Sequence, residues 1–172
     1  NFDITIGKYR LAALEKVAIK RSVENLADTA DITLPGTLFN RALKVEQKIA
    51  EGDAVRIRLG YDRILRDEFS GYVSEIATDN DSVRIHCEDE LYKFRKDLKD
   101  RVLKSVTVKT LLTSVAEEVG KYEVACDYDF TYDNFTIHAA TGYDVLRKVQ
   151  SETKANIYLG GKTLHVHPQY AQ

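Results

Sequence analysis

The first half of the chain alternates hydrophobic and polar residues with a period of two. Residues 55–60 read V-R-I-R-L-G, and residues 83–88 read V-R-I-H-C-E. Successive side chains of a β-strand point to opposite faces, so this pattern predicts strands with one buried and one solvated face.

A third strand is predicted between these two. Phe69, Gly71 and Val73 share one face, and Tyr72 and Ile76 lie on the other. A glycine inside a strand typically marks a bend or a bulge. We therefore expect an irregular strand that is covered on both faces.

Further β-rich runs lie upstream, at residues 17–23 and 30–34. Residues 51–53 and 79–81 carry Gly, Asp and Asn, which favour turns because their side chains or their φ freedom suit tight bends. Strands at this spacing, without helices between them, predict an antiparallel barrel or sandwich over residues 1–95.

The composition changes in residues 91–104, which hold six basic and two acidic side chains. We place the domain boundary here and assign residues 96–172 to a second domain. The charged residues of the segment are Lys93, Arg95, Lys96, Asp97, Lys99, Asp100, Arg101 and Lys104.

The second domain carries two helical patterns. The first covers residues 107–119, with Gly120 as its C-cap, and the second starts at the N-cap Thr141, with Asp144 three residues on, and ends near Lys154. The predicted inward faces are Val108, Leu111, Leu112, Val115 and Val119 for the first helix, and Tyr143, Leu146, Val149 and Gln150 for the second.

Strands are predicted around these helices at residues 123–126 and 136–139. A C-terminal hairpin joins residues 156–159 and 163–166 through the turn at residues 160–162. The predicted fold class is therefore α+β and mostly β, with two helices in the second domain.

Charge and composition exclude some classes of protein. The 25 Lys and Arg nearly balance the 27 Asp and Glu, so no overall field attracts nucleic acid or an anionic membrane. No apolar run approaches the roughly 20 residues of a membrane-spanning helix, and the first residues lack a signal-peptide pattern, so we expect a soluble protein made in the cytoplasm. Cys87 and Cys126 lack metal or disulfide spacing, and we expect both to be buried free thiols.

The histidines give a weak metal hypothesis. His165 and His167 are two apart on a predicted strand and therefore share a face. A strong site needs three or four ligands, and the third could come from His138, Asp127 or Asp129 only if the fold brings it near. The alternative is a pair of solvated or hydrogen-bonded histidines, and we expect no metal.

The sequence carries no recognisable catalytic motif. A glycosidase-like acid and base could come from paired carboxylates, but such residues also stabilise turns through their own backbone. Nucleophile elbows, zinc-protease motifs and phosphate-binding loops are missing. We expect neither catalytic nor cofactor-binding residues. The carboxylate pairs are Asp79/Asp81, Asp89/Glu90 and Asp127/Asp129.

Residues 91–96 come nearest to a nucleic-acid motif, because Tyr92 and Phe94 alternate with Lys93 and Arg95. The same alternation suits an amphipathic connector whose aromatic rings cover the open end of the barrel while its cations stay in water. We favour the connector and expect no specific binding of nucleic acid.

Three passages together resemble the phage late-control gene D family, which includes tail-hub proteins of Mu-like phages and is related to spike proteins of type VI secretion. Each passage is a loose pattern, and their order and separation carry the resemblance. Lys154 stands where relatives often have glycine. The passages are residues 4–7 with 17–35, residues 49–57 with 69–76, and residues 135–138 with 143–166.

The resemblance implies a structural role in a phage-type tail. The chain would be a component of the baseplate hub, encoded by a prophage and assembled in the bacterial cytoplasm. It would form a homotrimer and join the tail tube to spike and baseplate proteins. Family members carry a second barrel after the α+β part, which this sequence lacks, so we expect part of a hub and not the whole ring. Candidate partner or lumen contacts are Arg56, Arg58, Arg84, His86, Lys93 and Arg95.

Two other functions stay open at this stage. A tail-associated glycan hydrolase would need one carboxylate pair to converge in a cleft. A barrel that binds single-stranded nucleic acid would need exposed rings and cations on one surface.

Overall fold

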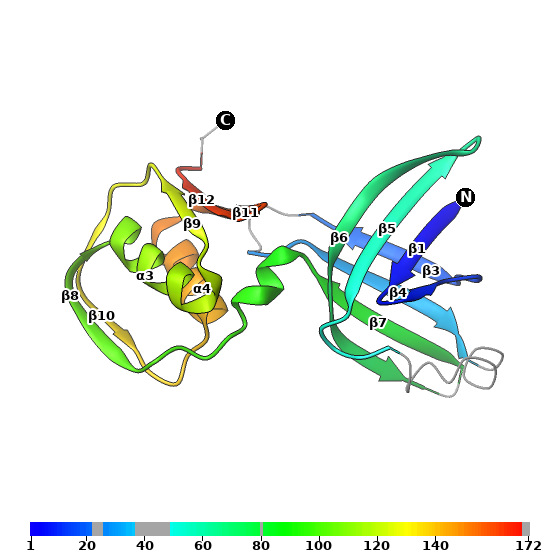
Figure 1. The fold of residues 1–172 in the computed structure, drawn as a ribbon, viewed down its shortest axis with the longest axis horizontal. Coiled ribbons are helices and arrows are strands. Elements are labelled where there is room, and N and C mark those ends of the chain that lie inside the picture. Colours follow the sequence, from blue (N-terminus) through cyan, green and yellow to red (C-terminus); the bar gives the residue numbers. More distant parts are fainter. Residues whose placement is uncertain (22–25, 37–48, 80, 170–172) are drawn as a thin grey trace. The chain divides into compact units, whose positions relative to one another are not determined.

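The computed structural model describes residues 1–21, 26–36, 49–79 and 81–169. It forms two compact units, Asn1–Tyr92 and Lys93–Gln172 (Figure 1). Within the described residues, no helix combines the length and apolarity needed to cross a membrane. The α+β fold with a majority of strands, predicted from the sequence, is confirmed.

The first unit is a seven-stranded antiparallel sheet with the strand order β2-β1-β5-β6-β7-β4-β3. All the strands predicted for this region are present. The end of the predicted run 17–23 and Asn80 of the predicted turn lie outside the described residues. The strands are β1 (Phe2–Ile6), β2 (Tyr9–Arg10), β3 (Lys16–Lys20), β4 (Thr29–Pro35), β5 (Ala54–Tyr61), β6 (Ile64–Thr78) and β7 (Ser82–Glu88).

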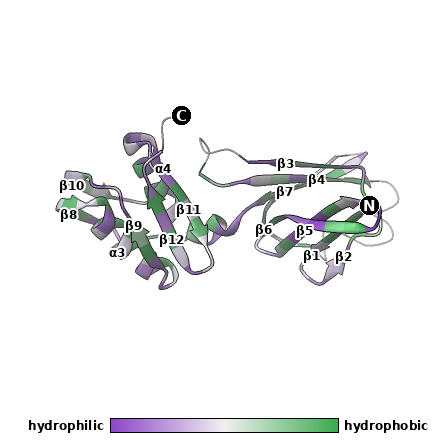
Figure 2. Cartoon of the chain, turned by 90° about the horizontal axis from the view of Figure 1, so that it is seen from above, coloured by the Kyte–Doolittle hydropathy of each residue, from purple (hydrophilic) through white to green (hydrophobic). Residues whose placement is uncertain are grey.

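Alternation of residue type gives this sheet one apolar face, visible as alternating hydrophobic and hydrophilic bands along the strands in Figure 2. In β4, Ala30, Ile32 and Leu34 are fully buried while the residues between them are only partly covered. Ile4 of β1 and Ile85 of β7 belong to the same core cluster. Strands from distant places in the sheet therefore share one core, which requires the sheet to curl.

The curled sheet does not close into the barrel that the sequence suggested. Within the described residues, the end strands β2 and β3 each pair with one neighbour only. Strand β2 is only two residues long, so it offers too few backbone groups to extend a ladder across to β3. The architecture is an open, curled sheet.

A β-bulge in β6 changes which side chains face the core. The register shifts between Val73 and Glu75, and Ile76 then pairs with Ile85. The extra residue reverses the alternation, so Ile76 packs against the same core as Val73. The prediction that Ile76 lies on the opposite face from Val73 was wrong. The bulge lies between Val73 and Glu75, after the glycine that suggested an irregularity, and it turns Ile76 to the face of Val73.

The second unit combines a short 3-10 helix, two α-helices and two small sheets. Sheet order is β10-β8 in one and β11-β12-β9 in the other, where β12 and β9 run parallel. The elements are η1 (Glu90–Phe94, which starts in the first unit), β8 (Arg101–Thr107), α3 (Val108–Gly120), β9 (Glu123–Cys126), β10 (Thr131–Ile137), α4 (Gly142–Thr153), β11 (Asn156–Gly160) and β12 (Thr163–His167).

Helix α3 follows its predicted apolar stripe but ends one residue later than expected. The Thr107 side chain caps the start of the helix by accepting a hydrogen bond from the backbone N–H of Thr110. At the other end, Lys121 adopts the left-handed cap conformation with φ 59°. Gly120 stays inside the helix, where a Cβ would lie 2.8 Å from the ring of Tyr122. The glycine is therefore required for close packing and does not supply the cap.

Helix α4 begins with the predicted capping box between Thr141 and Asp144. Its buried face includes Val145, which the sequence pattern missed, whereas Tyr143 is only partly buried. The helix ends at Lys154, which takes the left-handed conformation with φ 58°. The lysine therefore makes this left-handed turn without the help of a glycine.

Two strands of this unit differ from the sequence prediction. Strand β8 was not predicted. It begins inside the basic segment 91–104, where the domain boundary was placed, and Val106 is its one buried residue, so the apolar alternation is hidden. Strand β10 pairs with it and covers Thr131–Ile137, earlier than the predicted residues 136–139. The C-terminal hairpin is confirmed, with Gly160 opposite Thr163 and Gly161 at positive φ.

Candidate assembly surface

The arginines of β5 lie on the outer face of the first unit and are engaged in ion pairs. Arg56 Nε donates to Asp67 Oδ1 at 2.7 Å, and a second nitrogen donates to Asp67 Oδ2 at 2.9 Å. This two-point pairing is a favourable geometry for a guanidinium and a carboxylate. The hydrogen bond from Arg56 lowers the pKa of Asp67.

Arg58 contacts the carboxylate of Asp3, which also pairs with Arg10 through a 2.7 Å contact. The three residues come from β5, β1 and β2, so the cluster ties together neighbouring strands at one end of the sheet. Two of the predicted contact residues, Arg56 and Arg58, therefore form ion pairs within the chain.

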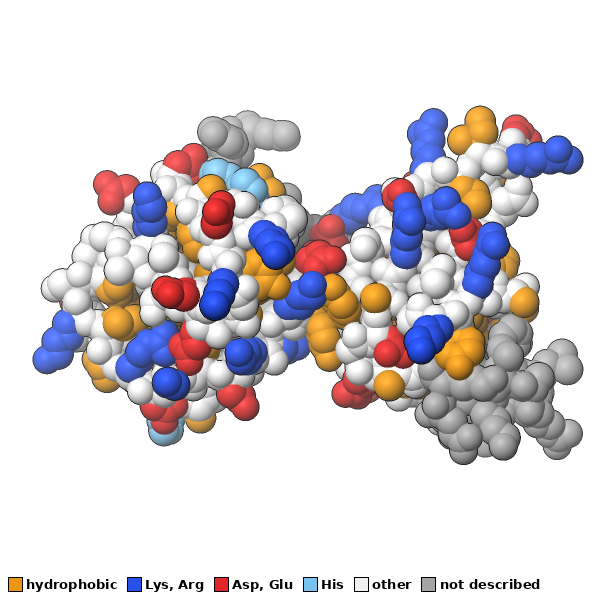
Figure 3. Space-filling view, viewed as in Figure 1, with side chains coloured by type: hydrophobic (Ala, Val, Ile, Leu, Met, Phe, Trp, Pro, Cys, Tyr) orange, Lys and Arg blue, Asp and Glu red, His pale blue; other side chains and the backbone are white. Residues whose placement is uncertain are grey.

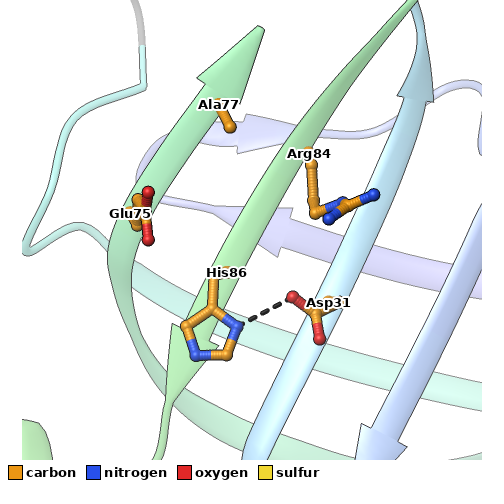
Figure 4. A pocket seen from close by; sticks show the side chains of 5 residues that line it. All are labelled: Asp31, Glu75, Ala77, Arg84 and His86. Atoms are coloured by element: carbon orange, nitrogen blue, oxygen red, sulfur yellow. Dashed lines mark hydrogen bonds and ion pairs between the residues drawn. The ribbon is translucent and has the colours of Figure 1, made fainter.

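Arg84 and His86 of β7 line a polar depression of about 230 Å³ on the first unit (Figure 4). Asp31 of β4 completes one side, with His86 Nδ1 2.8 Å from Asp31 Oδ1. Glu75 and Ala77 of β6 form the other side. The small side chain of Ala77, which pairs with Arg84, leaves the room for the hollow.

The bulge in β6 positions one wall of this depression. Beyond it, Glu75 pairs with His86, and Ser74 Oγ donates to the His86 carbonyl at 3.1 Å. Bulges are a common means of re-aiming a side chain. The depression combines two carboxylates, a guanidinium and an imidazole, which suits polar side chains of a protein partner better than an apolar ligand.

Lys93 and Arg95 belong to the second unit, whereas the other four predicted contact residues belong to the first. The guanidinium carbon of Arg95 lies 3.9 Å from the ring centroid of Tyr143, a cation–π contact. The six predicted contact residues thus fall into three separate places, namely the β5 ion pairs, the β7 depression and the start of the second unit.

The aromatic residues of the predicted connector, Tyr92 and Phe94, each pack against another aromatic ring. Tyr92 stacks on Tyr72 in the first unit at 5.8 Å. Phe94 is fully buried in the second unit and packs on Tyr122 at 5.3 Å. Rings held in this way do not provide a stacking platform for bases. These contacts do not favour the nucleic-acid interpretation. They also differ from the predicted connector, because Phe94 packs inside the second unit.

Two of the histidines form hydrogen-bonded pairs with aspartates, His138 with Asp100 and His167 with Asp127. His165 and His167 lie 5.6 Å apart, and His167 Nδ1 is 2.7 Å from Asp127 Oδ1. His138 instead pairs with Asp100 at 3.0 Å. In the described part of the chain, no group of three or more His, Cys, Asp or Glu is arranged to hold a metal ion.

The carboxylate pairs bond the local backbone or lie in solvent. Asp79 Oδ1 accepts from the backbone N–H groups of Asp81 and Ser82, as expected for a turn. Asp89 accepts from the N–H groups of Asp28 and Leu91, while its burial raises its pKa. These bonds account for the two pairs in the first unit without an acid–base role.

The two cysteines are free but differ in exposure. Cys87 is buried, and burial raises the pKa of its thiol to about 12. Cys126 is half-buried, and its Sγ lies 3.5 Å from the Tyr128 carbonyl oxygen. The expectation of two buried thiols therefore holds for Cys87 alone.

The hairpin between β5 and β6 exposes apolar side chains that the sequence analysis did not single out. Tyr61 is 89% exposed and Ile64 is 67% exposed. They pair across a two-residue turn formed by Asp62 and Arg63. Two apolar residues flanking a polar dipeptide are a recognisable hairpin signal, which could have identified this turn in the sequence.

Known proteins were compared with this chain by sequence and by structure. No family model and no curated protein sequence matches it. A 43 kDa tail protein of prophage MuSo2 from Shewanella oneidensis shares its fold over 96% of the chain, with a TM-score of 0.63 and 16% identity. The chain spans 53% of that protein.

Two other solved structures show the same similarity. Prophage tail protein gp18 from Listeria monocytogenes matches 96% of the chain with a TM-score of 0.58 and 13% identity, and the chain covers 50% of it. An E. coli component of the type VI secretion system, described as similar to the T4 tail proteins gp27 and gp5, matches 92% with a TM-score of 0.55 and 9% identity, over 51% of its length. At such identities the comparison shows a shared fold.

Proposed function

We propose that this chain is a structural component of a phage-type tail and that it acts as part of the baseplate hub. The observation that carries the proposal is the shared fold with a prophage tail protein over 96% of the chain at a TM-score of 0.63. The similarity covers both the curled sheet and the α+β unit. The chain spans about half of that protein, so the role of the whole assembly is inferred from the part that matches.

The character of the surface supports an assembly role. Four of the five residues that line the depression around Arg84 and His86 are charged or polar, which suits side chains from a neighbouring protein. The end strand β3 leaves one side of its backbone without a strand partner among the described residues, and its exposed Lys16 and Lys20 lie at either end. Lysines at an edge discourage indiscriminate pairing and leave the strand to a specific partner.

In this proposal the chain forms a homotrimer and contacts tail-tube, spike and baseplate proteins. It is encoded by a prophage, is assembled in the bacterial cytoplasm and ends in the tail of the virion. The chain has no enzymatic role and needs no cofactor. The backbone-bonded carboxylates of the first unit support this view, because a general acid or base must be free to reach a substrate.

Sedimentation velocity over a wide concentration range tests the oligomer, with the trimer or a monomer–trimer equilibrium as the expected result. Co-expression with the tube, spike and baseplate proteins encoded beside it tests the partners, and we expect co-purification with at least one of them. A chain that stays monomeric and never joins tail proteins contradicts the proposal.

Substitution in the depression refines this experiment. We expect Arg84→Glu with His86→Ala to weaken co-purification, because the depression loses its cationic wall. Arg147→Glu, on the exposed side of α4, is the matched control and is expected to leave it unchanged.

A further inference from the structure

The apolar inner face of the first sheet continues past its core into the β5–β6 hairpin. Along β5, Val55 and Ile57 are buried, Leu59 is partly buried against the core, and Tyr61 is 89% exposed. Ile64 lies directly opposite Tyr61 in the ladder. The row of apolar side chains that forms the core therefore continues to Tyr61 and Ile64, which are neighbours and lie in solvent.

The tip that presents them has the backbone geometry of a tight hairpin turn. Asp62 and Arg63 both have positive φ, at 51° and 67°, as in the mirror-image turns that match the twist of a hairpin. Residues with a side chain adopt this conformation at a cost, and Asn or Gly is the common choice. Gly60 allows the close approach of the two strands, because a Cβ there would lie 1.7 Å from the Ile64 carbonyl oxygen.

Basic side chains surround the apolar pair. Arg63 lies in the turn, and Arg66 follows Ile64 on the same face of the ribbon, opposite Leu59. Asp62 is the one acidic residue between positions 60 and 66. Figure 3 shows hydrophobic and basic side chains gathered at the free end of this hairpin. Tyr and Arg are the residue types that most often anchor protein interfaces.

The second unit carries a surface of complementary character. Phe130 is 39% exposed between the exposed carboxylates of Asp129 and Asp133. Residues 127–133 hold three aspartates and no lysine or arginine.

The backbone and ring of Phe130 are both held. Its carbonyl accepts from the N–H of Val108 at 2.9 Å, and its ring packs edge-on against Tyr132 at 4.9 Å. The acidic segment is therefore as preformed as the basic tip.

We propose that the hairpin tip of one copy (Tyr61, Arg63, Ile64, Arg66) docks on the acidic segment of a second copy (Asp129, Phe130, Asp133). Tyr61 and Ile64 pack against Phe130, and the arginines pair with the two aspartates. The two surfaces differ, so the contact is head-to-tail and forms a ring if the rotation closes. This inference rests on the proposed oligomer and names the residues that join its subunits.

The contact is small beside a standard protein interface, so a single contact binds weakly and ring closure adds the remaining stability. Both surfaces are preformed, which limits the loss of conformational freedom on binding. We therefore expect self-association that depends steeply on protein concentration and weakens with salt.

Charge reversal on the intact chain tests the pairing. We expect Arg63→Glu with Arg66→Glu to weaken self-association by about tenfold or more, since like charges then face each other. Asp129→Lys with Asp133→Lys has the same expected effect. A chain that carries all four substitutions restores association, because the reversed tip of each copy then meets the reversed segment of the next.

Two variants complete the design. Tyr61→Ser with Ile64→Ser removes the apolar anchor and also weakens association, whereas Arg147→Glu on α4 is the control. Circular dichroism and thermal melting check that each variant is folded, and sedimentation equilibrium measures the association.

The possible results distinguish a wrong interface, a wrong partner segment and a wrong oligomeric state. A wild-type chain that associates with an affinity unchanged by the reversals overturns this interface and leaves the oligomer standing. Weakening by the single reversals without restoration in the chain that carries all four substitutions shows that the tip meets another surface, and it overturns the assigned partner segment. A wild-type chain that is monomeric at all concentrations overturns both this contact and the trimer.

Discussion

At the scale of single residues, Asp3 shows how ionised side chains are used inside this fold. It is only 6% exposed and pairs with Arg10 and Arg58. The hydrogen bond from Arg58 lowers the pKa of Asp3, while burial acts in the opposite direction. A buried carboxylate depends on such partners, because without them the charge loses its hydration and gains nothing in return.

The pKa of Asp3 predicts how stability changes with pH. Because the folded pKa lies below the ordinary aspartate value, the stabilisation is complete above that ordinary value and is lost as the pH falls through the lowered one. We expect Asp3→Asn to lower the melting temperature most at neutral pH, with a gap from the wild type that shrinks on acidification. Thermal melts across the acid range measure it.

Asp81→Asn, at an exposed position outside the proposed interface, is the control for this series and is expected to change little. A gap between wild type and Asp3→Asn that stays constant from neutral to strongly acidic pH contradicts the assigned role of Asp3.

At the scale of elements, local signals and tertiary packing each fix different features. The N-terminus of α4 is set locally, since the Thr141 hydroxyl accepts from the Asp144 N–H and the Asp144 carboxylate accepts from the Thr141 N–H. Packing, in contrast, restricts the last residue of α3, since a Cβ at Gly120 would lie 2.8 Å from the ring of Tyr122. The bulge in β6 likewise follows from its pairing with β7.

The capping box gives a prediction at this scale. We expect Thr141→Ala to lower the free energy of unfolding by about 1 kcal/mol, because the Asp144 N–H loses its acceptor. Thr141→Ser is the matched control, since it keeps the hydroxyl, and should remain close to wild type. Urea denaturation of both variants measures the difference, and equal losses in the two would show that the hydroxyl has no such role.

At the scale of the whole molecule, the two units each have a core of their own. The first core lies within the curled sheet. The second includes Phe94, Leu111, Val115 and Leu146, all fully buried. We propose that the units are independent domains, because each buries its own apolar side chains.

Expressing the units separately tests this proposal. We expect residues 1–92 and residues 93–172 each to give a dispersed NMR spectrum and a cooperative melt. A second cut tests the role of Phe94, which belongs to the core of the second unit. We expect residues 96–172, which lack it, to melt at a lower temperature than residues 93–172. Equal melting temperatures would contradict the place of Phe94 in that core.

The sequence by itself determined strands β3 to β7 of the first sheet, both helices and the C-terminal hairpin, whereas β1 and β2 were not predicted. Residues 55–60 and residues 83–88 alternate with a period of two, and Thr141 with Asp144 marks a helix start. These signals are local: they depend on the geometry of neighbouring residues along the chain and can be read without knowing the fold.

Only the tertiary structure decided what these elements form together. It placed Arg58 on Asp3, brought Asp31 to His86, opened the expected barrel into a curled sheet and left Tyr61 in solvent. The two side-chain pairs depend on pairing between strands far apart in the sequence. Register and bulges set that pairing, and a shift of one residue sends every following side chain to the other face.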